Sequence, residues 1–200
     1  MNKKIAIIGA GGHGKVVGEI ALLNQFTTID FFDDKVSDLD GRFPFKILGA
    51  SNDLKNHLKH YSAYFVAIGD NKIRHEKINW LLKLNVRLTN LFHPKSTISQ
   101  YSTLGTGICI MAHAVVNPGT SIGNGAIINT SVSVDHDCFI EEFVHISPNC
   151  ALSGNVKVGK FTHIGTGSSI HPCINIGSNV KIGVGAKIYK DIEDNIIFNN

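Results

Sequence analysis

The chain has 200 residues, of which 43% are hydrophobic and 18% are charged, enough for one large domain or two small ones with a buried core. A formal net charge of +3 is too small to predict a nucleic-acid or membrane surface, and no apolar run is long enough to span a membrane. The four cysteines lack metal-type or redox-type spacing, so we expect reduced thiols, no metal and a cytoplasmic protein.

Residues 3–24, KKIAIIGAGGHGKVVGEIALLN, predict a buried strand, a glycine-rich turn and an amphipathic helix. Residues 9–14 satisfy the pattern G-x-G-x-x-G in the strand–turn–helix context that this pattern requires. Such a turn lets the backbone approach an anion at the helix N-terminus. We therefore expect Gly11, Gly12 and His13 to contact a phosphate group, with the imidazole adding a donor or a charge. The alternative is that the glycines serve only strand-to-helix packing.

A second predicted strand, TTIDFF, ends directly before Asp33 and Asp34, about twenty residues after the glycine turn. Carboxylates at this place commonly accept hydrogen bonds from a ribose hydroxyl or a base. We therefore expect both residues to contribute to the same binding site.

A third strand with a glycine turn at Gly69 follows in residues 62–72, then a helix in 71–85 and a short strand in 86–92. We expect Gly69 to belong to the same binding site. Alternating strands and helices predict a parallel sheet covered on both faces. Residues 1–92 supply only half of a doubly wound dinucleotide fold, a half-Rossmann-like α/β domain. A nucleotide joined to a small group, such as a nucleotide sugar, fits this domain better than NAD.

From Ile98 to Ile188 an aliphatic residue returns every six positions, sixteen times without exception. A helix repeats at 3.6 residues and a strand at 2, so neither explains this spacing. Spacing of six is typical of hexapeptide repeats in a parallel β-helix, where three hexapeptides form one coil and equivalent positions recur every 18 residues. Residues 93–200 are therefore predicted to form an all-β domain of about five coils.

The two halves together resemble a known family. The segments IIGAGGHGKVV, FFDDK, AIGDN, IINTSVSVDHDC and GNVKVGKFTHIG are similar to those of the hexapeptide-repeat nucleotide-sugar acetyltransferases, which include bacillosamine-type N-acetyltransferases and sialic acid O-acetyltransferases. The resemblance implies a left-handed β-helix and an N-terminal domain that holds the nucleotide sugar. It also implies a homotrimer with acetyl-CoA lying along the β-helix between subunits.

By the same resemblance, His136 is the general base and Asp137 its acidic partner, where other family members often have glutamate. The chemistry agrees, because the attacking amine must lose a proton as it bonds to the thioester carbon. An imidazole with a pKa near 6.5 suits that transfer at neutral pH. A neighbouring carboxylate raises its basicity and fixes its tautomer.

The resemblance further implies that His145 contacts acetyl-CoA near its thioester end and that the backbones of Thr166 and Val184 contact the same cofactor. The 18-residue repeat places His145, His163 and Lys181 in one column, which either lines the cofactor groove or is simply solvated. His145 lies half a coil from His136, so the two histidines are expected to meet only across a subunit interface. Glu141 and Glu142 are expected in an exposed turn.

Three functions remain open from the sequence. The leading one is acetyl-CoA-dependent N-acetylation of a UDP- or dTDP-linked amino sugar for surface glycan biosynthesis. The second is O-acetylation of a sugar such as sialic acid, and the third is a non-catalytic scaffold. The chain ends in DIEDNIIFNN and lacks the Gly-x-Pro-Ala-Lys segment common in the family. This difference affects the contacts that the resemblance implies for the adenine end of the cofactor.

Overall fold

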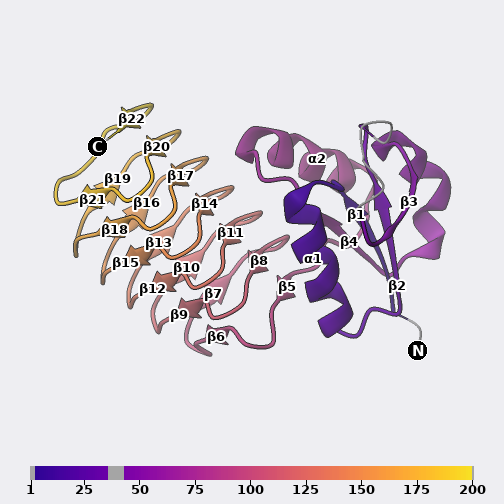
Figure 1. The fold of residues 1–200 in the computed structure, drawn as a ribbon, viewed down its shortest axis with the longest axis horizontal. Helices are drawn as coiled ribbons and strands as arrows, with labels where there is room; N and C mark the ends of the chain where they lie inside the picture. Colours follow the sequence, from indigo (N-terminus) through magenta and orange to yellow (C-terminus); the bar gives the residue numbers. More distant parts are fainter. Residues whose placement is uncertain (1–2, 36–42, 200) are drawn as a thin grey trace. The chain divides into compact units, whose positions relative to one another are not determined.

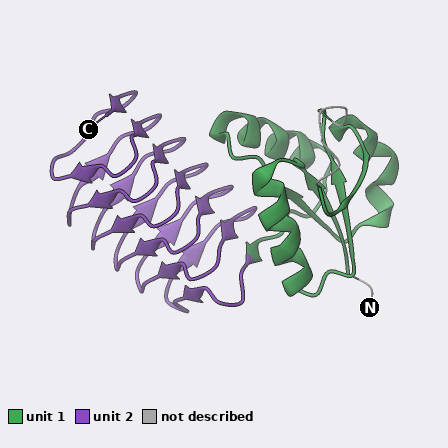
Figure 2. Ribbon diagram, in the orientation of Figure 1, with its two compact units in different colours: residues 1–91 green, residues 92–200 purple. Residues whose placement is uncertain are grey.

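The computed structural model describes residues 3–35 and 43–199. The chain forms two compact units, Met1–Leu91 and Phe92–Asn200 (Figure 2). The boundary between them lies one residue before the one expected after residue 92.

The first unit contains a four-stranded parallel sheet in the order β3-β2-β1-β4 (Figure 1). Its strands are β1 (Lys4–Ile8), β2 (Thr28–Phe32), β3 (Lys46–Gly49) and β4 (Ala63–Val66), and its helices are α1 (Gly12–Leu23), the 3₁₀ helix η2 (Ser51–His60) and α2 (Asn71–Lys83). Helix α1 packs on β1 and β2, and α2 packs on β4. The central strand β1 has its last four residues buried, as expected for a strand covered on both faces. The predicted α/β arrangement is confirmed.

Two details of this unit differ from the prediction. Strand β3 and the 3₁₀ helix were not predicted. The strand expected in 86–92 is reduced to a single bridge between Tyr64 and Leu88 and to β5 (Leu91–Phe92), which does not extend the first sheet and is described below with the second unit, where Phe92 lies.

The second unit is a parallel β-helix with three faces of two-residue strands (Figure 1). The first face, here the β14 face, contains β5, β8 (Cys109–Ile110), β11 (Ile127–Ile128), β14 (His145–Ile146), β17 (His163–Ile164), β20 (Lys181–Ile182) and β22 (Ile197–Phe198). The β12 face contains β6 (Thr97–Ile98), β9 (Val115–Val116), β12 (Ser133–Val134), β15 (Ala151–Leu152), β18 (Ser169–Ile170) and β21 (Lys187–Ile188). The β13 face contains β7 (Thr103–Leu104), β10 (Ser121–Ile122), β13 (Phe139–Ile140), β16 (Lys157–Val158) and β19 (Asn175–Ile176).

The register of these strands is the predicted 18 residues up to β20 and β21, as in the pairs Ile128–Ile146, Val134–Leu152 and Ile140–Val158. At the C-terminal end the offset is shorter, because Ile182 of β20 pairs with Phe198 of β22, 16 residues later. The second residue of each strand points inward, and from Ile110 to Ile188 these aliphatic side chains are at most 5% exposed. Small residues at the corners, such as Ala126, Val144 and Val156, complete the same core. Each coil thus buries its apolar residues against its two neighbours, which explains the six-residue pattern.

Candidate active site

His136 lies at the corner between the β12 and β13 faces. The corner is hydrogen-bonded to the coils on both sides, because Asp137 N donates to Pro118 O at 3.1 Å and Asn155 N donates to His136 O at 2.9 Å. Asp137 has a φ of +59°, a left-handed conformation that aspartate tolerates better than glutamate.

The side chains of His136 and Asp137 form a hydrogen-bonded pair, with Nδ1 and Oδ2 2.8 Å apart. Both are open to solvent, at 61% and 66% exposure. The hydrogen bond to Asp137, with a smaller contribution from the charge of Asp135, raises the pKa of His136 above 6.5. A carboxylate that accepts from Nδ1–H leaves the lone pair on Nε2, which is then the basic nitrogen. The pair has the chemistry of a general base and its orienting partner.

Asp135 was not singled out from the sequence, yet it holds this corner in place. Its Oδ1 accepts hydrogen bonds from His136 N at 2.8 Å and from Asn117 Nδ2 at 2.9 Å, and these bonds lower its pKa. Its carbonyl accepts from Thr120 Oγ1 at 2.7 Å, and Thr120 in turn accepts from Cys138 N at 3.2 Å. Asn117 lies 18 residues before Asp135, so the repeat itself could have indicated this contact.

His145 and His163 form the predicted column on the β14 face, which continues to Lys181. The two imidazole rings are stacked, with centroids 4.6 Å apart and planes 6° from parallel. Nε2 of His145 lies 3.3 Å from Asn129 Nδ2, and Nε2 of His163 lies 2.9 Å from Ser147 Oγ. Each imidazole therefore stacks on the other through its face and contacts a polar side chain through its Nε2 edge.

Thr166 and Val184 occupy equivalent corners after β17 and β20, and Gly185 N donates to Thr166 O at 2.8 Å. Both side chains are exposed, Val184 at 73%. Together with His145 they belong to three successive coils, whereas His136 is at a different corner. Their contact with a cofactor stays a prediction.

Glu141 and Glu142 do more than fill an exposed turn. Glu141 Oε2 accepts from Lys160 N at 2.8 Å, and Glu142 Oε1 accepts from Asn124 Nδ2 at 2.8 Å. The two carboxylates therefore link their own coil to the coils on either side.

The first unit contains a cavity of about 450 Å³ that is lined by all six residues predicted to bind the nucleotide sugar: Gly11, Gly12, His13, Asp33, Asp34 and Gly69. This volume falls within the range of small-molecule sites. The glycine turn ahead of α1 supplies backbone N–H groups at a helix N-terminus, where an anion is favoured.

The two aspartates already hold the walls of this cavity together. Asp33 accepts from Ala10 N at 2.6 Å and from Lys35 N at 2.8 Å. Asp34 accepts from Ser51 N at 2.8 Å and from Lys77 Nζ at 2.6 Å. Each carboxylate oxygen therefore has a protein donor, and a ligand hydroxyl would share these oxygens with it. The roles predicted for Asp33 and Asp34 in ligand binding remain predictions.

His13 is half-buried, with Nε2 shielded from solvent, and desolvation followed by the charge of Arg74 lowers its pKa to about 4. Its Nε2 has no hydrogen-bond partner. The imidazole of the ligand-free protein is therefore neutral at pH 7. The contact of His13 with a phosphate, through a donor or a charge, stays a prediction.

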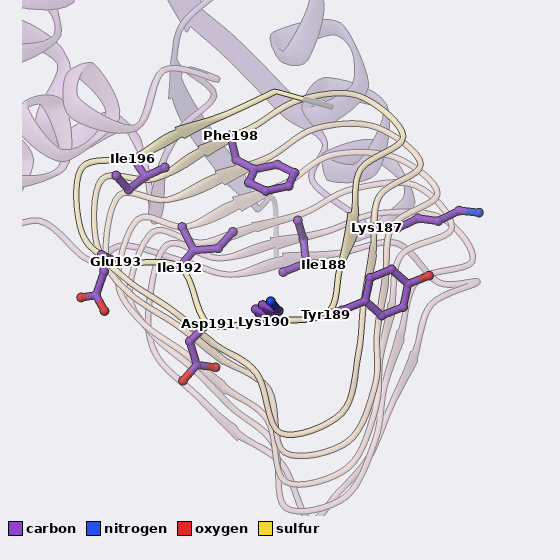
Figure 3. A pocket seen from close by; sticks show the side chains of 9 residues that line it. All are labelled: Lys187, Ile188, Tyr189, Lys190, Asp191, Ile192, Glu193, Ile196 and Phe198. Carbon is purple, nitrogen blue, oxygen red and sulfur yellow. The ribbon is translucent and has the colours of Figure 1, made fainter.

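A further cavity of about 440 Å³ lies at the last coil of the β-helix, where Ile188, Ile192 and Phe198 gather (Figure 3). None of the predicted site residues lines it.

Across residues 3–35 and 43–199, no helix is long and apolar enough to cross a membrane. Within the same ranges no three His, Cys, Asp or Glu side chains are grouped to hold a metal ion. All four cysteines are free thiols, three of them buried and Cys173 exposed.

Comparison with known proteins agrees with this arrangement. Residues 4–81 match the family model of the PglD N-terminal domain. The acetyltransferase domain of PglB from Neisseria gonorrhoeae, solved with acetyl coenzyme A, is 40% identical with a TM-score of 0.92, over 100% of this chain and 98% of that chain. Perosamine N-acetyltransferase from Caulobacter crescentus, solved as a mutant with CoA and GDP-perosamine, is 31% identical with a TM-score of 0.92, over 100% and 95% of the two chains.

A curated relative, UDP-N-acetylbacillosamine N-acetyltransferase of Bacillus subtilis, is 33% identical over 116 residues. The match covers 55% of this chain and about half, 52%, of that relative. The two solved relatives, in contrast, are matched over nearly their whole length and in both units. The chain therefore belongs to the hexapeptide-repeat nucleotide-sugar acetyltransferases that carry a PglD N-terminal domain.

Proposed function

We propose that this protein transfers the acetyl group of acetyl-CoA to the amino group of a nucleotide-linked amino sugar, for surface glycan biosynthesis. The observation that carries the proposal is the exposed His136–Asp137 pair, with a raised histidine pKa, on a β-helix. The cavity of the first unit supports it, because a glycine turn at a helix N-terminus suits the diphosphate of a sugar nucleotide. The relatives solved with acetyl-CoA, CoA and GDP-perosamine support the same ligand classes.

In this proposal His136 acts at Nε2. The amine nitrogen attacks the thioester carbonyl carbon, so that a C–N bond forms and the C–S bond breaks. Nε2 takes the proton that the nitrogen loses, and CoA leaves as a thiolate that is then protonated. Asp137 holds the imidazole in the required tautomer and stabilises the imidazolium that forms.

We also propose a cytoplasmic homotrimer with acetyl-CoA bound between subunits. His136 lies at a corner that includes neither the β14 face nor His145. A threefold arrangement would let a neighbouring subunit supply His145, together with Thr166 and Val184, to the site around His136.

The test is a thiol-release assay with acetyl-CoA and a panel of UDP-, dTDP- and GDP-linked amino sugars, with mass spectrometry of the products. With one of the amino sugars we expect the enzyme to release CoA and the sugar to gain a single N-acetyl group. With the N-acetylated form of that sugar we expect no CoA release. Sialic acid is the second acceptor class in the panel, because the sequence also allowed O-acetylation. Release with sialic acid alone would replace the N-acetyl proposal, and no release with any acceptor would favour a scaffold.

A further inference from the structure

Gly154 lies one coil after His136 at the same corner of the β-helix. The strands before these corners, β12 and β15, pair in register at Val134 and Leu152, and Asn155 N donates to His136 O. An ideal Cβ built on Gly154 would lie 2.6 Å from Cε1 of His136, 2.7 Å from Nε2 and 3.3 Å from Cδ2. The imidazole therefore occupies the space that a side chain at Gly154 would take.

The backbone of Gly154 does not itself require glycine. Its φ lies outside the left-handed region, and proline or histidine occupies the corners 18 residues apart in the same column, at Pro118, His136 and Pro172. An alanine would suit this backbone conformation. The imidazole of His136 is thus the feature that excludes a side chain here.

We infer that Gly154 is a positioning residue for His136: its missing side chain lets the imidazole lie in the plane that meets Asp137 and keeps Nε2 open to the acceptor amine. This inference rests on the proposed function for the role of Nε2, but the position of the ring is independent of it. A methyl group at Gly154 would push the ring towards solvent, because His136 is exposed and its side chain can rotate at little cost. Rotation would separate Nδ1 from the Asp137 carboxylate, 2.8 Å away.

The first experiment needs no substrate. The pKa of His136 is measured by NMR in protein with ¹³C-labelled histidine, and its signal is assigned by its loss in His136→Ala. In the parent protein we expect a pKa above 6.5, and in Gly154→Ala a lower pKa, closer to 6.5, because the hydrogen bond to Asp137 is lost. The melting temperature of Gly154→Ala should stay close to that of the parent. If Gly154→Ala does not fold, Gly154→Ala/His136→Ala should fold, because it lacks the ring.

Gly159→Ala is the matched control. Its added Cβ would meet backbone atoms, Ser178 N at 2.5 Å and Gly177 C at 2.6 Å. It should therefore lower the melting temperature and leave the pKa of His136 unchanged. A change of the pKa in both variants would mean that general loosening of the β-helix, and not contact with Gly154, controls the imidazole, and this would overturn the inference.

The second experiment uses the acetyl transfer reaction. Gly154→Ala should lower kcat by about 10- to 100-fold, less than complete loss of a general base, and leave KM for acetyl-CoA unchanged. Parent-like kcat together with a parent-like pKa of His136 would overturn the inference. If the parent protein transfers no acetyl group to any acceptor, the proposed function fails, while the NMR titration still decides the role of Gly154.

Discussion

Two histidines of this chain have pKa values shifted in opposite directions by their surroundings. His136 is exposed beside two carboxylates, which favour the imidazolium and raise its pKa. His13 is half-buried near Arg74, and both desolvation and the positive charge lower its pKa to about 4. One imidazole is thus suited to take up a proton near neutral pH, and the other stays neutral in a binding cavity.

The pH dependence of activity should follow the pKa of His136. Only the neutral imidazole can act as the base, so kcat/KM should fall as pH decreases through a pKa above 6.5. Asp137→Asn removes the main cause of the raised pKa, and the acidic limb should move to lower pH with about a tenfold loss of kcat. His136→Ala should lower kcat by about 10²–10⁴ with little change in cofactor affinity. An unchanged pH profile in Asp137→Asn would remove this carboxylate from the mechanism.

The half-buried His13 should make stability depend on pH in the acidic range. Its folded-state pKa of about 4 lies below the ordinary 6.5, so the unfolded state binds a proton first. Its contribution is fully present above pH 6.5 and is lost as pH falls towards 4, by up to about 3 kcal/mol. Thermal melts of the ligand-free protein at pH 7 and pH 5 should differ less in His13→Asn than in the parent. The exposed His171 gives the control, since His171→Asn should keep the parent's pH dependence.

Buried hydroxyl groups recur as an element of the β-helix corners. Thr120 donates to Asp135 O and accepts from Cys138 N, and Thr162 donates to Gly177 O and accepts from Val180 N. Each threonine is fully buried and joins its coil to the next one through these two bonds. The two bonds of Thr120 hold the corner that contains His136, whereas the two bonds of Thr162 hold a corner without predicted site residues.

This difference makes the two threonines a matched pair for mutagenesis. Thr120→Val and Thr162→Val should each destabilise the protein by about 1–2 kcal/mol, because each loses two buried hydrogen bonds. Only Thr120→Val should also lower kcat, since its partners Asp135 and Cys138 flank the base and its carboxylate. Chemical denaturation and steady-state kinetics measure the two effects. Equal kcat in both variants would show that the corner keeps its geometry without the hydroxyl.

The sequence predicted the elements that show a periodic or local motif within their own residues. Every inward aliphatic residue of the β-helix is visible at spacing six, and the glycine turn is local. Strand β3 has only four residues, and the 3₁₀ helix is polar apart from Leu54 and Leu58, so neither was predicted. Asn117, Thr120 and Gly154 act through residues in neighbouring coils. The 18-residue spacing could have paired Asn117 with Asp135 and Gly154 with His136, but which atoms meet depends on side-chain directions, and these do not follow from spacing alone. The bonds of Asp33 to Ala10 and of Asp34 to Lys77 depend on how the sheet is assembled.

For the whole molecule, the proposed trimer can be tested by complementation. His136→Ala and His145→Ala subunits, each inactive alone, should regain part of the activity when refolded together, because some interfaces then carry one intact copy of each histidine. Light scattering should give about three times the chain mass of 21.7 kDa. A fully active monomer, or well-mixed trimers without restored activity, would show that one chain contains its whole site.

The 18-residue register also limits how a gene for this protein can change length during evolution. Adding or removing 18 codons within the β-helix keeps every downstream side chain on its face and only lengthens or shortens the stack. A change of six codons keeps the aliphatic period intact, so the core still closes, but it rotates every downstream residue by one third of a turn. Six residues gained between His136 and His145 would thus move His145 to another face without disturbing its hydrophobic neighbours. Natural length variation should therefore occur in whole coils or in loops that leave the prism at its corners.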